Sequence, residues 1–233
     1  MNITTRSVAM SLTVMVVALP LSVDLSYGSG VGPVVREATE TIIKWLGRKG
    51  GTEAAEELAA YGGRKAVRTT VERVAREGGE KAVARLARLT QKYGMDVLRT
   101  ADTADAPARV LKAVDNLADG TAGKAIRRLA GSDGPELARL TVRYGEEVLE
   151  AEAKHPGLGM RLAGKLGNDG IDLARRVTAP QALTVSRHAD DIATLPTRQR
   201  GRLLALLKRK TDEMVKFMGR FTEDNPGKVL FTG

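Results

Sequence analysis

The chain has 233 residues, with 37 Lys or Arg against 28 Asp or Glu, so its formal net charge is +9. Hydrophobic residues make up 42% of it and aromatic residues only 3%, a composition that excludes global disorder and favours closely packed helices over a β-sandwich. It contains no cysteine, which excludes disulfides, zinc–thiolate sites and thiol nucleophiles.

The first 28 residues have the pattern of a secretory signal peptide. Arg6 supplies a positive start, residues 8–19 are an apolar run that Pro20 ends, and the small residues Ser26 and Gly28 follow on either side of Tyr27. This run is shorter than the roughly 20 apolar residues that a membrane-spanning helix needs. We therefore expect residues 1–28 to be a signal peptide, or alternatively an uncleaved N-terminal anchor. The protein is then exported to the periplasm or the cell exterior.

Residues 29–195 are expected to form a domain of short helices. Pro33 suits the first turn of a helix whose apolar face carries Val35, Ala38, Ile42 and Leu46. After it, glycines recur at short intervals with a helical period between them, and each glycine is expected to end one helix. These glycines are Gly63, Gly79, Gly94, Gly123, Gly145 and Gly170.

One phrase occurs twice in this domain. Residues 86–98 read LARLTQKYGMDVL and residues 137–149 read LARLTVRYGEEVL, 51 positions later, and residues 183–192 (LTVSRHADDI) resemble a degraded third copy. Helices this short need neighbours to bury their apolar stripes. The sequence thus predicts an all-α fold of about ten short helices. They form either an α-solenoid-like array of internal repeats or an irregular bundle that contains an old duplication. The expected repeat junctions are Tyr93, Gly94, Tyr144, Gly145 and His188.

The C-terminal part has a different pattern. Residues 196–220 are predicted to form one longer, basic amphipathic helix over 197–219 that closes the array, followed by a tail over 221–233. Residues 198–210 contain six basic residues and no acid, which is typical of a helix that contacts an anionic surface. The alternative is that the bases only hydrate the outer face of a capping helix. The candidate contacts are Arg198, Arg202, Lys208, Arg209 and Lys216. The apolar ending of the tail leads to the hypothesis that a natural chain continues into a membrane segment.

Candidate catalytic residues are few. His188 lies three residues before Asp191, so the two side chains can share a helical face. However, His188 takes the place of the repeat tyrosines, which favours a packing role. Four carboxylates cluster at Glu146, Glu147, Glu150 and Glu152, and we interpret them as a solvated helix face. His155 precedes Pro156 and is expected in a loop, and Trp45 is expected in the core.

We therefore expect no catalytic residue, cofactor or metal site. The low aromatic content and the absence of a nucleic-acid-binding motif argue against a nucleic-acid partner. The interpretation that we favour is a non-enzymatic, exported helical scaffold or adaptor that binds a protein partner or an anionic envelope component. Association with a membrane surface through the basic C-terminal helix is the first alternative, and an uncharacterised hydrolase is the second.

Overall fold

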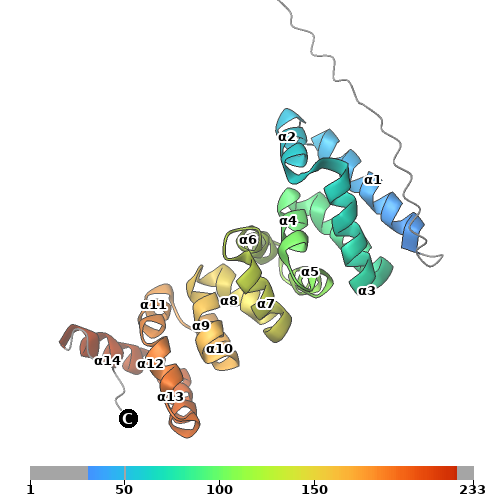
Figure 1. Ribbon diagram of the computed structural model, residues 1–233. Coiled ribbons are helices and arrows are strands. Elements are labelled where there is room, and N and C mark those ends of the chain that lie inside the picture. Colours follow the sequence, from blue (N-terminus) through green and yellow to red (C-terminus); the bar gives the residue numbers. More distant parts are fainter. Residues whose placement is uncertain (1–30, 50, 225–233) are drawn as a thin grey trace, which may run out of the picture.

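The computed structural model describes residues 31–49 and 51–224, which form 14 α-helices and no strand (Figure 1). The all-α fold class predicted from the sequence is therefore confirmed. The helices are α1 (Val31–Lys49), α2 (Gly51–Tyr61), α3 (Gly63–Tyr93), α4 (Met95–Thr103), α5 (Pro107–Asp115), α6 (Asp119–Leu129), α7 (Gly134–Tyr144), α8 (Glu146–Lys154), α9 (Leu158–Leu166), α10 (Asn168–Arg176), α11 (Ala179–Arg187), α12 (Ala189–Thr194), α13 (Thr197–Arg209) and α14 (Thr211–Asp224). The expected signal peptide and residues 225–233 of the expected tail lie outside the described residues.

The helices follow one another along an elongated body, with α1–α3 at one end and α11–α14 at the other (Figure 1). The main contacts join helices no more than three positions apart in chain order, such as α1 with α3, α9 with α12, and α11 with α14. A continuous apolar core nevertheless runs along the whole body, from Val35 to Met218. Each short helix is stabilised by its immediate neighbours, as its length requires.

The predicted apolar face of the first helix is confirmed. Val35, Ala38, Ile42 and Leu46 are all buried against the body, and α1 packs on α3. The expected number of about ten helices is too low. Helices also begin at prolines such as Pro107, whose fixed backbone suits a first helical turn.

The glycines act in two ways, of which the sequence predicted one. Gly94 and Gly145 end α3 and α7 with φ of 77° and 82°, and Gly79 kinks α3 with φ of 63°. Only glycine adopts this region readily. The prediction is wrong for Gly123 and Gly170, which lie inside α6 and α10. Gly170 serves close helix packing, because a Cβ there would lie 2.1 Å from the carbonyl oxygen of Leu162, whereas a Cβ at Gly123 would make an ordinary contact with the Tyr93 ring at 3.5 Å.

The expected single long helix over 197–219 is wrong. It is two helices, α13 and α14, separated at Lys210, which has φ of −128° and ψ of 50°. The longest helical segment of the described residues is instead α3, whose 31 residues are interrupted by the kink at Gly79. Asp212 and Glu213 lie in the first turn of α14, where carboxylates interact favourably with the helix dipole. The break lets α14 pack beside α11, where the Gln181 side-chain amide donates a hydrogen bond to the Asp212 carboxylate.

Candidate interaction surface

The outer face of α13 carries three arginines, Arg198, Arg202 and Arg209. At 100° per residue their positions lie within about 40° of one another around the helix. All three side chains are exposed, and none forms an ion pair within the described part of the chain. The opposite face holds Leu204 and Leu207, which are 2% and 0% exposed. We call Arg198, Arg202 and Arg209 the basic ridge.

The other two predicted surface contacts do not belong to this ridge. The Lys208 Nζ lies 2.7 Å from Asp169 Oδ1 and 2.9 Å from Asp172 Oδ2, so it fastens α13 to α10. Lys216 is exposed but lies on α14, beyond the break at Lys210. The structure therefore brings together three of the five predicted residues and separates the other two.

The Lys208 contact should make stability depend on pH. Burial opposes the charged form of Lys208, but hydrogen bonds to Asp169 and Asp172 outweigh it and hold the pKa of the ammonium above its ordinary value. The same hydrogen bond from Lys208 holds the pKa of the Asp172 carboxyl below its ordinary value. A carboxyl pKa that is lower in the folded state stabilises the fold above its ordinary pKa, and this stabilisation disappears as the pH falls through the lowered value.

We therefore expect Lys208→Met to lower the free energy of unfolding by about 1 kcal/mol or less at neutral pH, because solvent screens these partly exposed groups. The difference between the two proteins should shrink as the pH falls below about 4, the ordinary pKa of aspartate. Urea unfolding at neutral and acidic pH measures it. A difference that stayed constant across this range would show that the ion pairs of Lys208 with Asp169 and Asp172 do not cause it.

The two Tyr-Gly junctions have the same local geometry. The Gly94 N–H donates to the carbonyl oxygen of Thr90, and the Gly145 N–H donates to that of Thr141, both at 2.8 Å. Each threonine hydroxyl in turn donates to the carbonyl of the residue four positions earlier. The backbone hydrogen bond that ends the helix and the threonine hydrogen bond beside it are therefore the same at both junctions.

The two tyrosines also have similar surroundings. The Tyr93 ring faces Gly123, the Tyr144 hydroxyl faces Gly167, and a Cβ at either glycine would lie within 3.4–3.5 Å of the ring or hydroxyl. The basic residue directly before each tyrosine lies over its ring. Lys92 Nζ is 5.4 Å from the centroid of the Tyr93 ring, and the Arg143 guanidinium is 5.0 Å from that of the Tyr144 ring. Both tyrosines therefore pack against glycines of later segments and act as structural residues.

His188 joins the C-terminal helices. It is only 6% exposed, and its Nε2 lies 2.9 Å from the Thr222 hydroxyl. Because that hydroxyl donates to the carbonyl oxygen of Met218, it accepts from the His188 N–H. Nδ1 lies 3.5 Å from Asp191 Oδ2, so the predicted shared face of His188 and Asp191 is confirmed. The Nε2 contact with Thr222 therefore links His188, at the start of α12, to α14, and the Nδ1 contact lies within α12.

His155 has a comparable role between α8 and α10. It follows the last residue of α8 and is 4% exposed. Its Nε2 lies 3.1 Å from the carbonyl oxygen of Val177, which follows α10. Its Nδ1 is buried and has no hydrogen-bond partner. His155 therefore connects the ends of two helices.

The interpretation of the glutamate cluster as a solvated face is wrong for Glu152. This side chain is 0% exposed and accepts a hydrogen bond of 2.8 Å from Arg128 Nε. It also accepts from the backbone N–H groups of Gly157 at 2.6 Å and Met160 at 2.8 Å, so it caps the first turn of α9. A sequence signal was available, because Glu152 follows Val148 by four positions and therefore lies on the apolar face of its helix.

The other glutamates of the cluster are partly exposed. Glu146 and Glu147 lie in the first turn of α8, where their charge favours the helix N-terminus. Glu150 pairs with Arg175 Nε of α10 at 2.8 Å.

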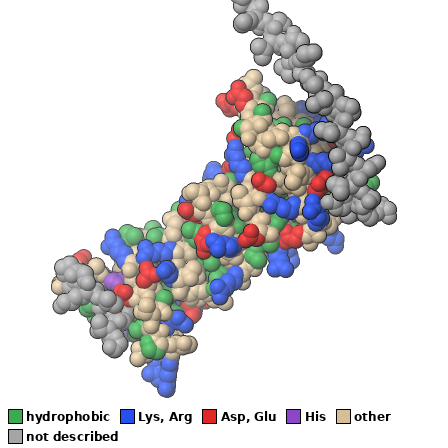
Figure 2. Space-filling view, in the orientation of Figure 1, with side chains coloured by type: hydrophobic (Ala, Val, Ile, Leu, Met, Phe, Trp, Pro, Cys, Tyr) green, Lys and Arg blue, Asp and Glu red, His purple; other side chains and the backbone are tan. Residues whose placement is uncertain are grey.

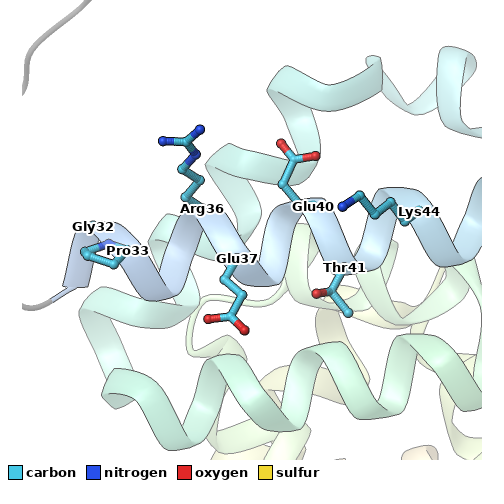
Figure 3. Close-up of a pocket in the computed structure, with 7 residues that line it drawn as sticks. All are labelled: Gly32, Pro33, Arg36, Glu37, Glu40, Thr41 and Lys44. Atoms are coloured by element: carbon cyan, nitrogen blue, oxygen red, sulfur yellow. The ribbon is translucent and has the colours of Figure 1, made fainter.

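A surface hollow lies along α1, at the other end of the body (Figure 3). Arg36 and Glu40 extend to one side of the helix and Glu37 and Thr41 to the other, while the Lys44 side chain runs along the helix (Figure 3). Glu40 also forms an ion pair with Arg64 of α3. The hollow is lined by both acidic and basic residues. Among the described residues they all come from α1, so their charges do not converge on a common point. The lining residues are Gly32, Pro33, Arg36, Glu37, Glu40, Thr41 and Lys44.

Comparison with protein-family models, with curated proteins and with solved structures found no match to this chain. Across residues 31–49 and 51–224, no helix combines the length and the apolar content that crossing a bilayer would require. The basic ridge of α13 is therefore the feature of the described residues from which a function is best argued.

Proposed function

We propose that the protein is an exported, non-enzymatic helical scaffold whose basic ridge binds an anionic component of the cell envelope. The observation that carries the proposal is the contrast on α13. Lys208 is held by two aspartates of the body, whereas the three ridge arginines face solvent without an ion pair in the described chain. Guanidinium groups bind carboxylates and phosphates through paired hydrogen bonds. A row of them on a rigid helix fits a repeating anionic ligand.

The scaffold is proposed to be an array of repeated helical units. Helices α4 and α8 each have nine residues and begin 51 positions apart, and the same is true of α5 and α9. Both pairs follow a Tyr-Gly junction of equal geometry, with His188 as the third and altered junction. These correspondences, and main contacts that join near neighbours in the chain, favour a solenoid-like array over an irregular bundle.

A triple variant tests the binding proposal. Replacing Arg198, Arg202 and Arg209 with glutamate should abolish binding to vesicles that contain phosphatidylglycerol, because it reverses the charge of the ridge. Binding of the unaltered protein should weaken as salt rises, since the screening length falls from about 10 Å at 0.1 M to about 3 Å at 1 M ionic strength. Co-sedimentation measures both effects.

The matched control is Arg175→Glu with Glu150→Arg, which exchanges the partners of an ion pair elsewhere on the body. It should leave vesicle binding unchanged. If the triple variant still bound the vesicles as strongly as the unaltered protein, the ridge would not be the binding surface. Soluble anionic polysaccharide, tested in the same way, separates a carboxylate ligand from a lipid phosphate.

Association with a membrane surface is the second candidate, and it is favoured by the last described helix. Phe217 on α14 is 51% exposed, one of two large hydrophobic side chains of the described residues that face solvent. Met214 and Phe221, at i−3 and i+4, are partly buried against the core, so Phe217 is the exposed member of an apolar stripe along α14. An aromatic residue on such a stripe can enter the headgroup region of a bilayer. Phe217→Ser should then weaken vesicle binding even at high salt.

The hydrolase alternative has less support, because both ring nitrogens of His188 already face protein partners.

A further inference from the structure

Helix α2 is the least covered helix near the α1 end of the body. None of its residues whose side chains the structure describes is buried, and only Leu58 and Tyr61 are half-buried. Helices of 11 residues are marginal without packing, yet α2 presents most of its circumference to solvent. Its outer face is therefore an unpartnered helix surface.

This surface is acidic. Glu53, Glu56 and Glu57 are its only charged residues, and they share one side of the helix with Ala60, because spacings of three, four and seven recur on one face. Glu57 pairs with Arg99 at 3.2 Å. Glu53 and Glu56 are exposed and form no ion pair within the described part of the chain. We call Glu53, Glu56 and Ala60 the acidic face.

The acidic face and the basic ridge complement each other. Helix α2 carries acids and no base, whereas α13 carries bases and no acid. The two helices lie at opposite ends of the body, and Figure 2 shows acidic side chains at the α2 end and basic ones at the α13 end. Because of this separation, the two surfaces of one molecule cannot contact each other. The basic ridge of a second copy can contact the acidic face of the first.

The dimensions and the small residues agree with such a contact. At a rise of about 1.5 Å per residue, Arg198 and Arg202 are separated by about 6 Å along α13, and Glu53 and Glu56 by about 4.5 Å along α2. Gly201 and Ala205 are exposed beside the ridge arginines, and Ala59 and Ala60 are exposed on α2. Small side chains let two helix surfaces approach closely, so the long arginine side chains can reach the glutamates on the facing helix.

We propose that the acidic face of α2 docks on the basic ridge of a second copy of this chain, so that molecules associate head to tail. The inference rests on the proposed function, because it gives the same ridge a specific partner. A contact between unlike surfaces is heterologous and leaves a free surface at each end, so it builds open chains instead of closed dimers. The contact is small and charged, so association is weak and sensitive to salt.

Charge exchange tests this arrangement. Glu53→Lys with Glu56→Lys reverses the acidic face, and Arg202→Glu with Arg209→Glu reverses most of the ridge. In sedimentation velocity of the full chain at low salt, the unaltered protein should show concentration-dependent association, and each reversal alone should weaken it about tenfold or more. A chain with all four substitutions should regain association, because both surfaces are reversed together. An equal mixture of the two reversed chains should also associate.

Several results would overturn the inference. They are a monomeric unaltered protein at low salt, undiminished association of the α2-reversed chain, and lack of recovery in the fourfold variant. Because lysine near the start of α2 could loosen that helix, Glu53→Gln with Glu56→Gln serves as a second variant and should also reduce association. Vesicle binding separates the two proposals. Reversing the charges of α2 should leave vesicle binding intact. If only the chains with reversed α13 charges lose vesicle binding, the proposed function is supported, whatever the association measurements show.

Discussion

Replacing Gly159 with alanine is expected to destabilise the protein by about 3 kcal/mol. Gly159 lies in the first turn of α9, where this helix crosses α8 at short range. A Cβ there would lie 2.4 Å from the carbonyl carbon of Ala151 and 2.5 Å from the backbone nitrogen of Glu152. These are backbone atoms and cannot turn aside, so the two helices would have to separate and lose buried contacts on both sides.

Gly164→Ala in the same helix is the matched control. A Cβ at Gly164 would meet nothing within 4 Å, and alanine is favoured over glycine inside a helix by about 0.5–1 kcal/mol. This variant should therefore be slightly more stable than the unaltered protein. Urea unfolding followed by circular dichroism measures both. Equal midpoints for the two variants would mean that α8 and α9 do not pack as closely as described.

Replacing Glu152 with alanine should cost about 2–3 kcal/mol, because it leaves hydrogen-bond donors without their buried acceptor, while Arg128 itself is 35% exposed. The change leaves Arg128 without its main carboxylate partner, since the other, Asp133, is 3.7 Å away. It also leaves the N–H groups of Gly157 and Met160 without an acceptor at the start of α9. The loss should appear in the unfolding midpoint and in faster amide exchange of the first turn of α9.

Glu150→Ala, in the same helix, is the control for the Glu152 prediction. Glu150 and Arg175 form an ion pair in which both side chains are about 40% exposed, and such pairs contribute about 0–1 kcal/mol. The two variants remove the same chemical group, so the difference between them measures the effect of burial. If Glu150→Ala were as destabilising as Glu152→Ala, burial would not explain the role of Glu152.

The sequence predicted well wherever a local rule decides the structure. Val35, Ala38, Ile42 and Leu46 lie on the buried face because helical period alone places them there. Gly94 and Gly145 end their helices because positive φ is accessible to glycine and strained for other residues. The break before α14 also had a local signal, the acids at 212 and 213, which the uninterrupted apolar period of residues 203–218 concealed.

The candidate surface was predicted only in part. The spacing of Arg198, Arg202 and Arg209 on one helix is a property of the sequence, and it holds. The bend at Lys210 moved Lys216 to another helix, and the approach of α10 turned Lys208 into an internal contact. Burial of Glu152 likewise depends on Arg128, 24 positions earlier in the chain.

The sequence by itself determined the helical class, the positive-φ stops and the apolar faces, because these follow from the backbone preferences and the period of residues that are close in the chain. Only the tertiary structure decided which charges stay exposed. Whether a lysine or a glutamate remains in water depends on which helix packs over it, and that contact is set by residues far away in the sequence. This is why the basic ridge and the acidic face of α2 became distinct surfaces only after the helices were assembled.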